Sequence, residues 1–173
     1  MICICRTFAG LAFVTLIANP AQAQVRIMLP AWNEAVLMDS MKVEQALRAE
    51  PEAVYAAVLR VYADLEIPTG NTDNIKGIIG SEVFEKIHRF VGATLSRSFS
   101  CGDSANGPNA DSYRLSIAVV TWVAPGANGG TTLASATVAS GRDVAGASRV
   151  PRHCASTGAI ETKIAAAVER YLK

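Results

Sequence analysis

Apolar side chains recur along the chain with two different periods. Between residues 51 and 65 they return every three to four positions, which predicts an amphipathic helix that begins at Pro51 and has ended by Pro68. A second helix is expected over 158–172, where an apolar stripe runs along one face and charged residues remain in water. The stripe consists of Ile160, Ile164, Val168 and Leu172, and the charged residues are Glu161, Lys163, Glu169 and Arg170.

A period of two predicts a β-hairpin in the second half of the chain. Residues 113–123 are β-branched and apolar, residues 131–140 are mostly small, and a glycine-rich turn over 125–130 joins them. Residues 41–48 alternate in the same way and predict a strand, although their residue types also favour a helix.

The segments between these elements are shorter. Residues 75–79 are expected to form a short strand, with a turn over 69–74 before it and a loop over 101–112 after it. Residues 81–91 fit either a helix or a strand, and we favour the strand because it gives the hairpin a neighbour. A basic loop is expected over 141–153.

The order of these elements predicts an α+β fold. An antiparallel sheet of four to five strands with both helices on one face buries each apolar stripe once. This arrangement resembles the β-α-β(4)-α layout of the TATA-binding-protein-like folds, and a helix-grip barrel is the alternative.

The first 23 residues have the features of an export signal. Arg6 precedes an apolar run of about 11 residues, which is too short for a membrane span of about 20. Ala21-Gln22-Ala23 then fits a cleavage site. The alternative is a helix that belongs to the core.

Cleavage at this site would leave a single domain over 24–173, in which residues 24–40 are only weakly patterned. Cys3 and Cys5 lie too early to serve as a lipid-attachment site, so no stable membrane anchor is expected. We therefore expect a periplasmic or secreted protein.

Composition and charge narrow the function classes. Half of the 173 residues are hydrophobic and 18% are charged, which excludes a chain that is disordered throughout. The 16 Lys and Arg residues nearly balance the 15 Asp and Glu residues. The basic surplus that a nucleic-acid binder uses to release counterions is therefore missing, and nucleic acid is not expected as a partner.

Two cysteines, Cys101 and Cys154, follow the expected cleavage site. In an oxidising compartment such a pair most simply forms a disulfide, which would close a loop of about 50 residues and stabilise the fold by about 4 kcal/mol. A metal site would need more ligands, and only His153 is adjacent to either cysteine. A redox pair would usually be spaced as Cys-x-x-Cys.

Three groups of residues are candidates for ligand binding. Tyr55, Tyr62 and Trp122 could line a pocket between the first helix and the sheet, or simply pack in the core. A positively charged rim could bind an anion at the start of the last helix, where the helix dipole favours negative charge, or could be solvated. The rim candidates are Arg142, Arg149, Arg152 and His153.

The loop over 101–112 is rich in oxygen ligands. Asp103 and Asp111 are weak candidates for calcium, although Asp is also an ordinary turn residue. No metal or other cofactor is expected.

Catalytic motifs are missing from the sequence. It contains no Gly-x-Ser-x-Gly, no His-Glu-x-x-His and no Walker loop, so no catalytic residue is assigned. His153 and Ser156 could act as base and nucleophile of an unrecognised hydrolase, but Ser156 is better explained as a helix cap.

Several short segments resemble a known group of proteins. They are Leu95-Ser96, Cys101-Gly102, Ala110-Asp111-Ser112-Tyr113 and Cys154-Ala155-Ser156-Thr157-Gly158-Ala159-Ile160-Glu161. They are similar to a family of small secreted bacterial proteins without an assigned activity. The resemblance covers residues 45–173 and implies fold and export. A looser similarity links the chain to the helix-plus-sheet domains of outer-membrane assembly lipoproteins, from which it departs by lacking a lipid-attachment cysteine.

Three functions are compatible with these observations. The first is an exported, non-enzymatic domain that binds a protein or cell-envelope component through its sheet face or the 141–153 loop. The second is a carrier of a small apolar ligand, held between helix 51–65 and the sheet. The third is the unrecognised hydrolase. The first is preferred.

Overall fold

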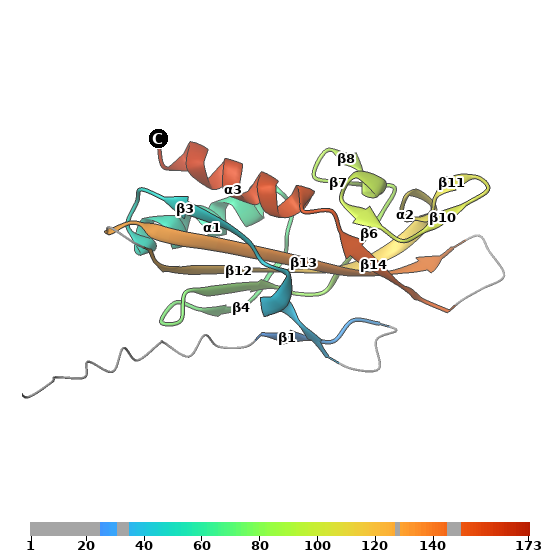
Figure 1. The fold of residues 1–173 in the computed structure, drawn as a ribbon, viewed down its shortest axis with the longest axis horizontal. Coiled ribbons are helices and arrows are strands. Elements are labelled where there is room, and N and C mark those ends of the chain that lie inside the picture. Colours follow the sequence, from blue (N-terminus) through green and yellow to red (C-terminus); the bar gives the residue numbers. More distant parts are fainter. Residues whose placement is uncertain (1–24, 31–34, 127–128, 145–149) are drawn as a thin grey trace, which may run out of the picture.

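The computed structural model describes residues 25–30, 35–126, 129–144 and 150–173. The expected export signal and Arg149 lie outside these ranges. The described chain forms an α+β fold with three α-helices and a large antiparallel sheet (Figure 1). The expected class is confirmed, but the sheet has eight strands and not four to five.

A long hairpin forms the spine of the sheet. Strands β12 (Tyr113–Pro125) and β13 (Thr131–Asp143) pair along all 13 residues of each strand, from Tyr113 opposite Asp143 to Pro125 opposite Thr131. This confirms the hairpin that the sequence predicts. Both strands begin at the predicted residue and continue two or three residues beyond the predicted end, because each added residue still has a partner on the other strand.

Each strand of the hairpin has different neighbours at its two ends. Near the turn, β5 (Ile78–Ser81) pairs with β12 and β3 (Val43–Leu47) pairs with β13. At the other end, β6 (Phe84–Ile87) pairs with β12 and β14 (Arg152–Ser156) pairs with β13. The outermost strands are β4 (Thr69–Asp73), beside β5, and β9 (Phe99–Ser100), beside β14.

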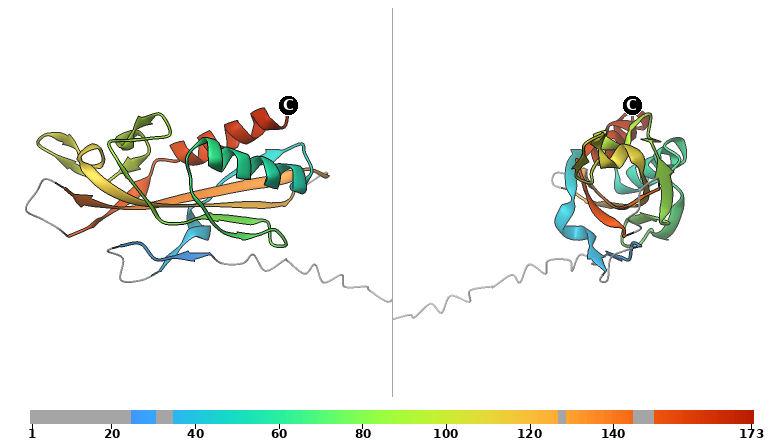
Figure 2. Two further views of the ribbon diagram at one scale, coloured as in Figure 1. Left: turned by 180° about the vertical axis from the view of Figure 1, so that it is seen from behind. Right: turned by 90° about the vertical axis from the view of Figure 1, so that its right-hand side faces the viewer.

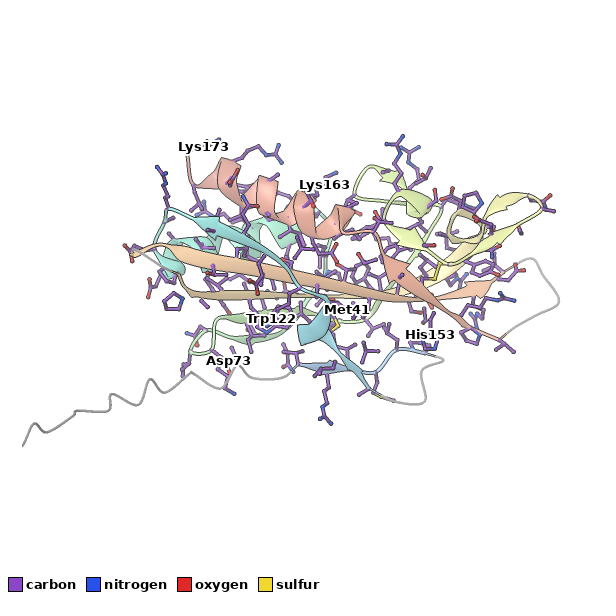
Figure 3. The ribbon with its side chains drawn as sticks, viewed as in Figure 1. Met41, Asp73, Trp122, His153, Lys163 and Lys173 are labelled. Atoms are coloured by element: carbon purple, nitrogen blue, oxygen red, sulfur yellow. A yellow bond between two sulfur atoms is a disulfide. The ribbon has the colours of Figure 1, made fainter. Side chains whose placement is uncertain are left out.

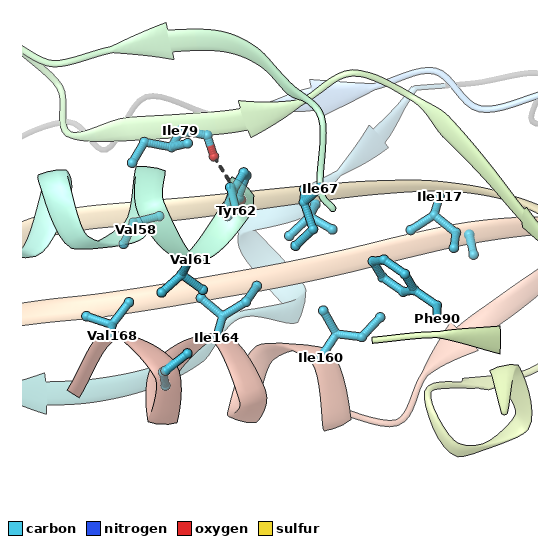
Figure 4. Close-up of a cluster of buried hydrophobic side chains, with 14 of the residues drawn as sticks. Val58, Val61, Tyr62, Ile67, Ile79, Phe90, Ile117, Ile160, Ile164 and Val168 are labelled. Carbon is cyan, nitrogen blue, oxygen red and sulfur yellow. Dashed lines mark hydrogen bonds between the residues drawn. The ribbon is translucent and has the colours of Figure 1, made fainter. Parts of the chain in front are cut away.

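Two helices cover one face of the hairpin. They are α1 (Pro51–Asp64) and α3 (Ala159–Tyr171), which contact each other as well as the sheet (Figure 1). Their apolar stripes face the odd-numbered residues of β12 and form the larger core (Figure 4). Both helices lie where the sequence predicts them, and Pro51 is the first residue of α1.

A thinner layer covers the other face. It consists of β1 (Arg26–Ile27), β2 (Val36–Leu37) and the 3₁₀ helix η1 (Met38–Met41), and it lies on the side of the hairpin opposite the helices (Figures 1 and 2). Leu29 and Met38 pack there against even-numbered residues of the hairpin. Because both faces of the hairpin are covered, its strands are apolar over most of their length.

The connecting segments contain more structure than the sequence predicts. The expected turn over 69–74 is the edge strand β4, and the expected loop over 101–112 holds β10 (Asp103–Ser104), β11 (Gly107–Pro108) and α2 (Asn109–Ser112). The preference for strand over helix in 81–91 is confirmed. There β6 is followed by β7 (Arg89–Phe90), which pairs with β8 (Ala93–Thr94) ahead of the 3₁₀ helix η2 (Leu95–Arg97).

The expected disulfide between Cys101 and Cys154 is present and spans 53 positions of sequence. It ties the segment after β9 to β14, with a distance of 4.3 Å between the two Cα atoms. Gly141 on β13 leaves room for it, because a Cβ atom there would lie 3.1 Å from the Cys154 Sγ and 2.8 Å from the Leu115 Cδ2. Among the described residues, no helix is long and apolar enough to cross a membrane.

Candidate functional site

The three aromatic pocket candidates do not come together. Tyr62 of α1 is fully buried between the helix and the sheet, where its hydroxyl donates to the Ile79 carbonyl at 3.3 Å and lies 3.1 Å from the Thr121 Oγ1 (Figure 4). Trp122 belongs to the opposite face of the sheet, because it is even-numbered on β12 (Figure 3). Tyr55 is half-buried at the edge of the helix-side core. The expectation that they line one pocket is therefore wrong.

Burial also changes the chemistry of Tyr62. Removal from water raises the pKa of its hydroxyl far above the usual value of 10.0, although the Thr121 hydroxyl partly opposes this shift. The Thr121 Oγ1 lies 3.0 Å from the Ser135 Oγ. Tyr62, Thr121 and Ser135 thus form a chain of hydroxyl groups that satisfy one another inside the core.

The three described rim candidates lie on the neighbouring strands β13 and β14. Arg142 lies at the end of β13 and Arg152 at the end of β14 that is farther from α3, and both side chains are exposed. His153 follows Arg152 on β14 and is also exposed. Arg142 and Arg152 are therefore not gathered at the start of α3, contrary to expectation. Arg149 is outside the described residues.

The calcium candidates have different surroundings. Both carboxylate oxygens of Asp111 accept hydrogen bonds from Ser96, from its backbone N–H at 2.8 Å and from its hydroxyl at 2.7 Å. Asp103 is exposed on β10. Within the described ranges, no group of three or more His, Cys, Asp and Glu residues is placed to hold a metal ion.

His153 and Ser156 point to opposite sides of β14. His153 is opposite Ser140, and Cys154, opposite Ala139, faces the helix-side core. Ser156 is two residues after Cys154 and shares its side of the strand. Its hydroxyl donates to the Glu161 carboxylate, at 2.9 Å from Oε1 and 3.1 Å from Oε2. The hydrogen-bond partner of Ser156 is thus an acid from α3.

A more distinctive feature is an interruption in the outer neighbours of β13. β3 pairs with Thr131 to Ser135, and β14 pairs with Ala139 to Gly141. Among the described strands, only β12 pairs with the three residues between them. The interruption arises because β14 turns away to pair with β9, and because η1 replaces the strand before Val43. We call this interruption the β13 notch.

The register shows which backbone groups face the β13 notch. The N–H of Val119 points away from β13, because it donates to the Ser81 Oγ at 2.9 Å. Val119 is directly opposite Thr137. Directly opposed residues of an antiparallel pair either both bond to each other or both point outward. The backbone N–H and C=O of Thr137 therefore point outward into the notch.

The side chain of Thr137 is also without a partner. The residue is only 1% exposed, and its Oγ1 is buried with no hydrogen bond. Leaving a buried hydroxyl unbonded costs about 1–3 kcal/mol. Thr137 lines a cavity of about 470 Å³ at the notch, so a bound group could supply the missing hydrogen bond.

Glu161 provides a buried carboxylate in the same cavity. It lies in the first turn of α3 and is 2% exposed, so the expectation that it remains in water is wrong. Ser156 positions it, since the same hydroxyl that donates to Glu161 accepts the Gly158 N–H at 3.1 Å. The helix N-terminus favours a negative charge there.

The rest of the notch is mostly apolar. Met41 from η1 and Val43 from β3 form one side, and each is 41% exposed. Ala155 and His153 of β14 form the other. The notch therefore combines apolar walls, an unpartnered hydroxyl, outward-facing backbone groups and a buried acid, which is a composition suited to ligand binding.

A second cavity, of about 430 Å³, lies beside the end of α1. Its cations already have partners: Lys86 pairs with Glu66 at 3.0 Å, Arg89 donates to the Gly92 carbonyl at 3.1 Å, and Lys163 donates to the Val91 carbonyl. The latter two bonds hold the turn between β7 and β8, where Val91 has φ +47°, a strained value for a β-branched residue. This cavity has a structural explanation, so the β13 notch is the better candidate.

Sequence reasoning missed both Thr137 and Glu161. The period of α3 offered a signal for Glu161, because it precedes the buried Ala165 by one turn and lies beside Ile160. No signal along the sequence marks Thr137, because the notch depends on where two distant strands end.

In comparisons with known proteins, the chain matches no family model and no curated protein.

Proposed function

We propose that the protein is an exported, non-enzymatic binding domain, and that it binds an extended segment of a partner protein at the β13 notch. Export is inferred from the features of residues 1–23 and agrees with the disulfide. The resemblance to small secreted bacterial proteins points in the same direction.

The observation that carries the proposal is the outward-facing backbone of Thr137 between the ends of β3 and β14. An extended peptide can add to a sheet at such an unpaired position, with its main chain providing affinity and its side chains specificity. The apolar walls formed by Met41 and Val43 would contact those side chains.

The other two hypotheses have less support. A carrier pocket under α1 would require space that the fully buried Val58, Val61 and Tyr62 already fill. A hydrolase using His153 and Ser156 would require both side chains on one side of β14. Neither hypothesis explains why Thr137 on β13 lacks an outer strand partner.

The test is selection from a library of random decapeptides displayed on phage with free amino termini, using the oxidised protein as bait. Ala155→Trp places a bulky ring in the notch at an exposed position of β14. The matched control is Ile75→Trp, at a position that is 93% exposed and outside the residues that line the notch.

We expect the enriched peptides to bind the wild type and Ile75→Trp equally, and Ala155→Trp at least tenfold more weakly. Enrichment of no peptide, or of peptides that bind all three proteins equally, would refute the proposal. Circular dichroism and thermal unfolding of each variant establish that it is folded.

A further inference from the structure

The β13 notch contains a negative charge that the described protein does not neutralise. The Glu161 carboxylate receives a hydrogen bond from Ser156, and no cation in the described part of the chain forms an ion pair with it. An ionised carboxylate has about four acceptor positions, and its burial is costly unless they are used. The α3 terminus offsets only part of this cost. A cationic ligand would offset more of it.

The length of the notch restricts the shape of the ligand. Three residues, from Ala136 to Val138, lack an outer strand, and this corresponds to about 10 Å of extended chain. Only Thr137 among them directs its backbone groups outward. An internal segment of a partner would have to turn away at both ends of the notch, whereas a chain end has to leave only once.

The charge and the length together point to one class of ligand. We propose, on the basis of the binding function above, that the notch binds the free amino terminus of a partner protein. The terminal ammonium group contacts the Glu161 carboxylate, and the first residues pair with the backbone N–H and C=O of Thr137. An apolar side chain near the terminus packs on Met41 and Val43.

The ligand also explains the unpartnered hydroxyl of Thr137. Peptide N–H and C=O groups can bond to it in either direction, because a hydroxyl both donates and accepts. An amino terminus thus satisfies three groups that the described chain leaves with free bonding capacity: the carboxylate of Glu161, and the hydroxyl and outward backbone of Thr137. Capture of a terminal amine is a known mode of peptide recognition.

The experiment uses two chemical forms of the peptides enriched by the phage selection. Each lysine-free sequence is synthesised as a peptide amide, once with a free amino terminus and once acetylated. Binding to the oxidised protein is measured by isothermal titration calorimetry. Amide shifts in ¹⁵N NMR spectra locate the peptide, and the shifts at Thr137 and Glu161 identify the notch.

We expect acetylation to weaken binding by about tenfold to a hundredfold, which is the range for loss of a charge-assisted hydrogen bond. Glu161→Gln should have a similar effect on the free peptide and little effect on the acetylated one, because glutamine can still accept the Ser156 hydrogen bond. Glu169→Gln is the matched control, since Glu169 lies on the same helix and bonds instead to Gln45.

The outcomes separate this inference from the proposed function. If acetylated and free peptides bind the notch with equal affinity, the amino-terminal assignment is wrong and docking at the notch stands. If Glu161→Gln and Glu169→Gln weaken binding equally, the carboxylate of Glu161 is not the contact and the assignment again fails. If the selection enriches no notch-binding peptide, both proposals fall.

Discussion

The two long strands of the hairpin each have a break between their outer neighbours, and only one of the two breaks is closed. On β12 the break between β5 and β6 is bridged by Ser81, whose hydroxyl accepts the Val119 N–H. On β13 the break between β3 and β14 has no equivalent side chain, and the hydroxyl of Thr137 is buried without a partner.

The two breaks lie directly opposite each other, since Val119 and Thr137 are paired in the hairpin. Their backbone requirements are the same, so the difference lies only in the connecting segments. The link from β5 to β6 is short and leaves Ser81 in place, whereas β3 and β14 are far apart in sequence and leave the sheet in different directions. On β12 a single serine is enough to bond the backbone at the break, and no such side chain is present at Thr137. The unbonded groups of Thr137 therefore point to a role in binding.

The largest effect is expected from removing the covalent support of one side of the β13 notch. The double substitution Cys101→Ser, Cys154→Ser should lower the free energy of unfolding by about 4 kcal/mol, because it frees a loop closed over 53 positions in the unfolded chain. Urea denaturation measures the loss. Hydrogen exchange should accelerate more in β14 than in β5, and equal acceleration in both would contradict this account.

A smaller loss is expected from the hydroxyl chain inside the core. Tyr62→Phe removes bonds to the Ile79 carbonyl and to Thr121, and should cost about 1–2 kcal/mol at neutral pH. In contrast to Thr137, these hydroxyls are satisfied, so their removal destabilises. Chemical denaturation of the two proteins gives the difference.

The same tyrosine should also make stability depend on alkaline pH. Burial raises its pKa in the folded state above 10.0, the value expected for the unfolded chain. The folded state therefore holds this proton up to a higher pH than the unfolded chain does. The contribution of Tyr62 to the free energy of unfolding is fully present below pH 10 and declines as pH rises beyond it. Above this pH, the free energy of unfolding of the wild type should fall more steeply with pH than that of Tyr62→Phe. Equal slopes for the two proteins would exclude the effect.

Removing the Ser81 hydroxyl, which bridges the break on β12, should lower the free energy of unfolding by as much as Tyr62→Phe does or by less. Ser81→Ala leaves the N–H of the fully buried Val119 unbonded and should destabilise by about 1 kcal/mol. Ser81→Thr keeps the acceptor and serves as the control. Exchange of the Val119 amide proton, followed by NMR, should accelerate in the alanine variant alone.

The smallest effect has the opposite sign. Thr137→Val replaces an unbonded buried hydroxyl by a methyl group and should raise stability by up to about 1 kcal/mol. The same substitution should weaken binding of the selected peptides, because the hydroxyl is lost. A variant that is less stable than the wild type would show that the hydroxyl is satisfied in solution and that the two breaks do not differ in this respect.

Much of the fold follows from local patterns. The hairpin and both long helices have clear periods, and the disulfide was expected from two cysteines in a chain with the features of an export signal. The sequence also contained the information that Trp122 and Tyr62 lie on opposite faces of the sheet. The strict period of β12 puts Leu115, Ile117 and Thr121 on one face and Trp122 on the other.

Other features depend on tertiary contacts that no local pattern encodes. The strand β4 reads as a turn, because Thr69–Asp73 is polar and lies at the edge of the sheet, where few side chains need to be buried. The β13 notch exists because the last residues of β14 pair with β9 and not with β13. Glu161 is buried because the first turn of α3 lies next to these residues. The candidate site is thus a property of strand ends, which are the least predictable part of an element.

The layer on the far side of the sheet includes residues that closely follow the proposed cleavage site. Val25 accepts the backbone N–H of Met38 at 3.0 Å and packs beside the cluster that covers Trp122. Removal of the proposed export signal after Ala23 would keep this contact, whereas a cut after Val25 would remove it and reduce the apolar cover of the sheet. If the chain is processed as proposed, the exact cleavage point would therefore affect how much of this apolar face is exposed, and with it the tendency of the protein to aggregate.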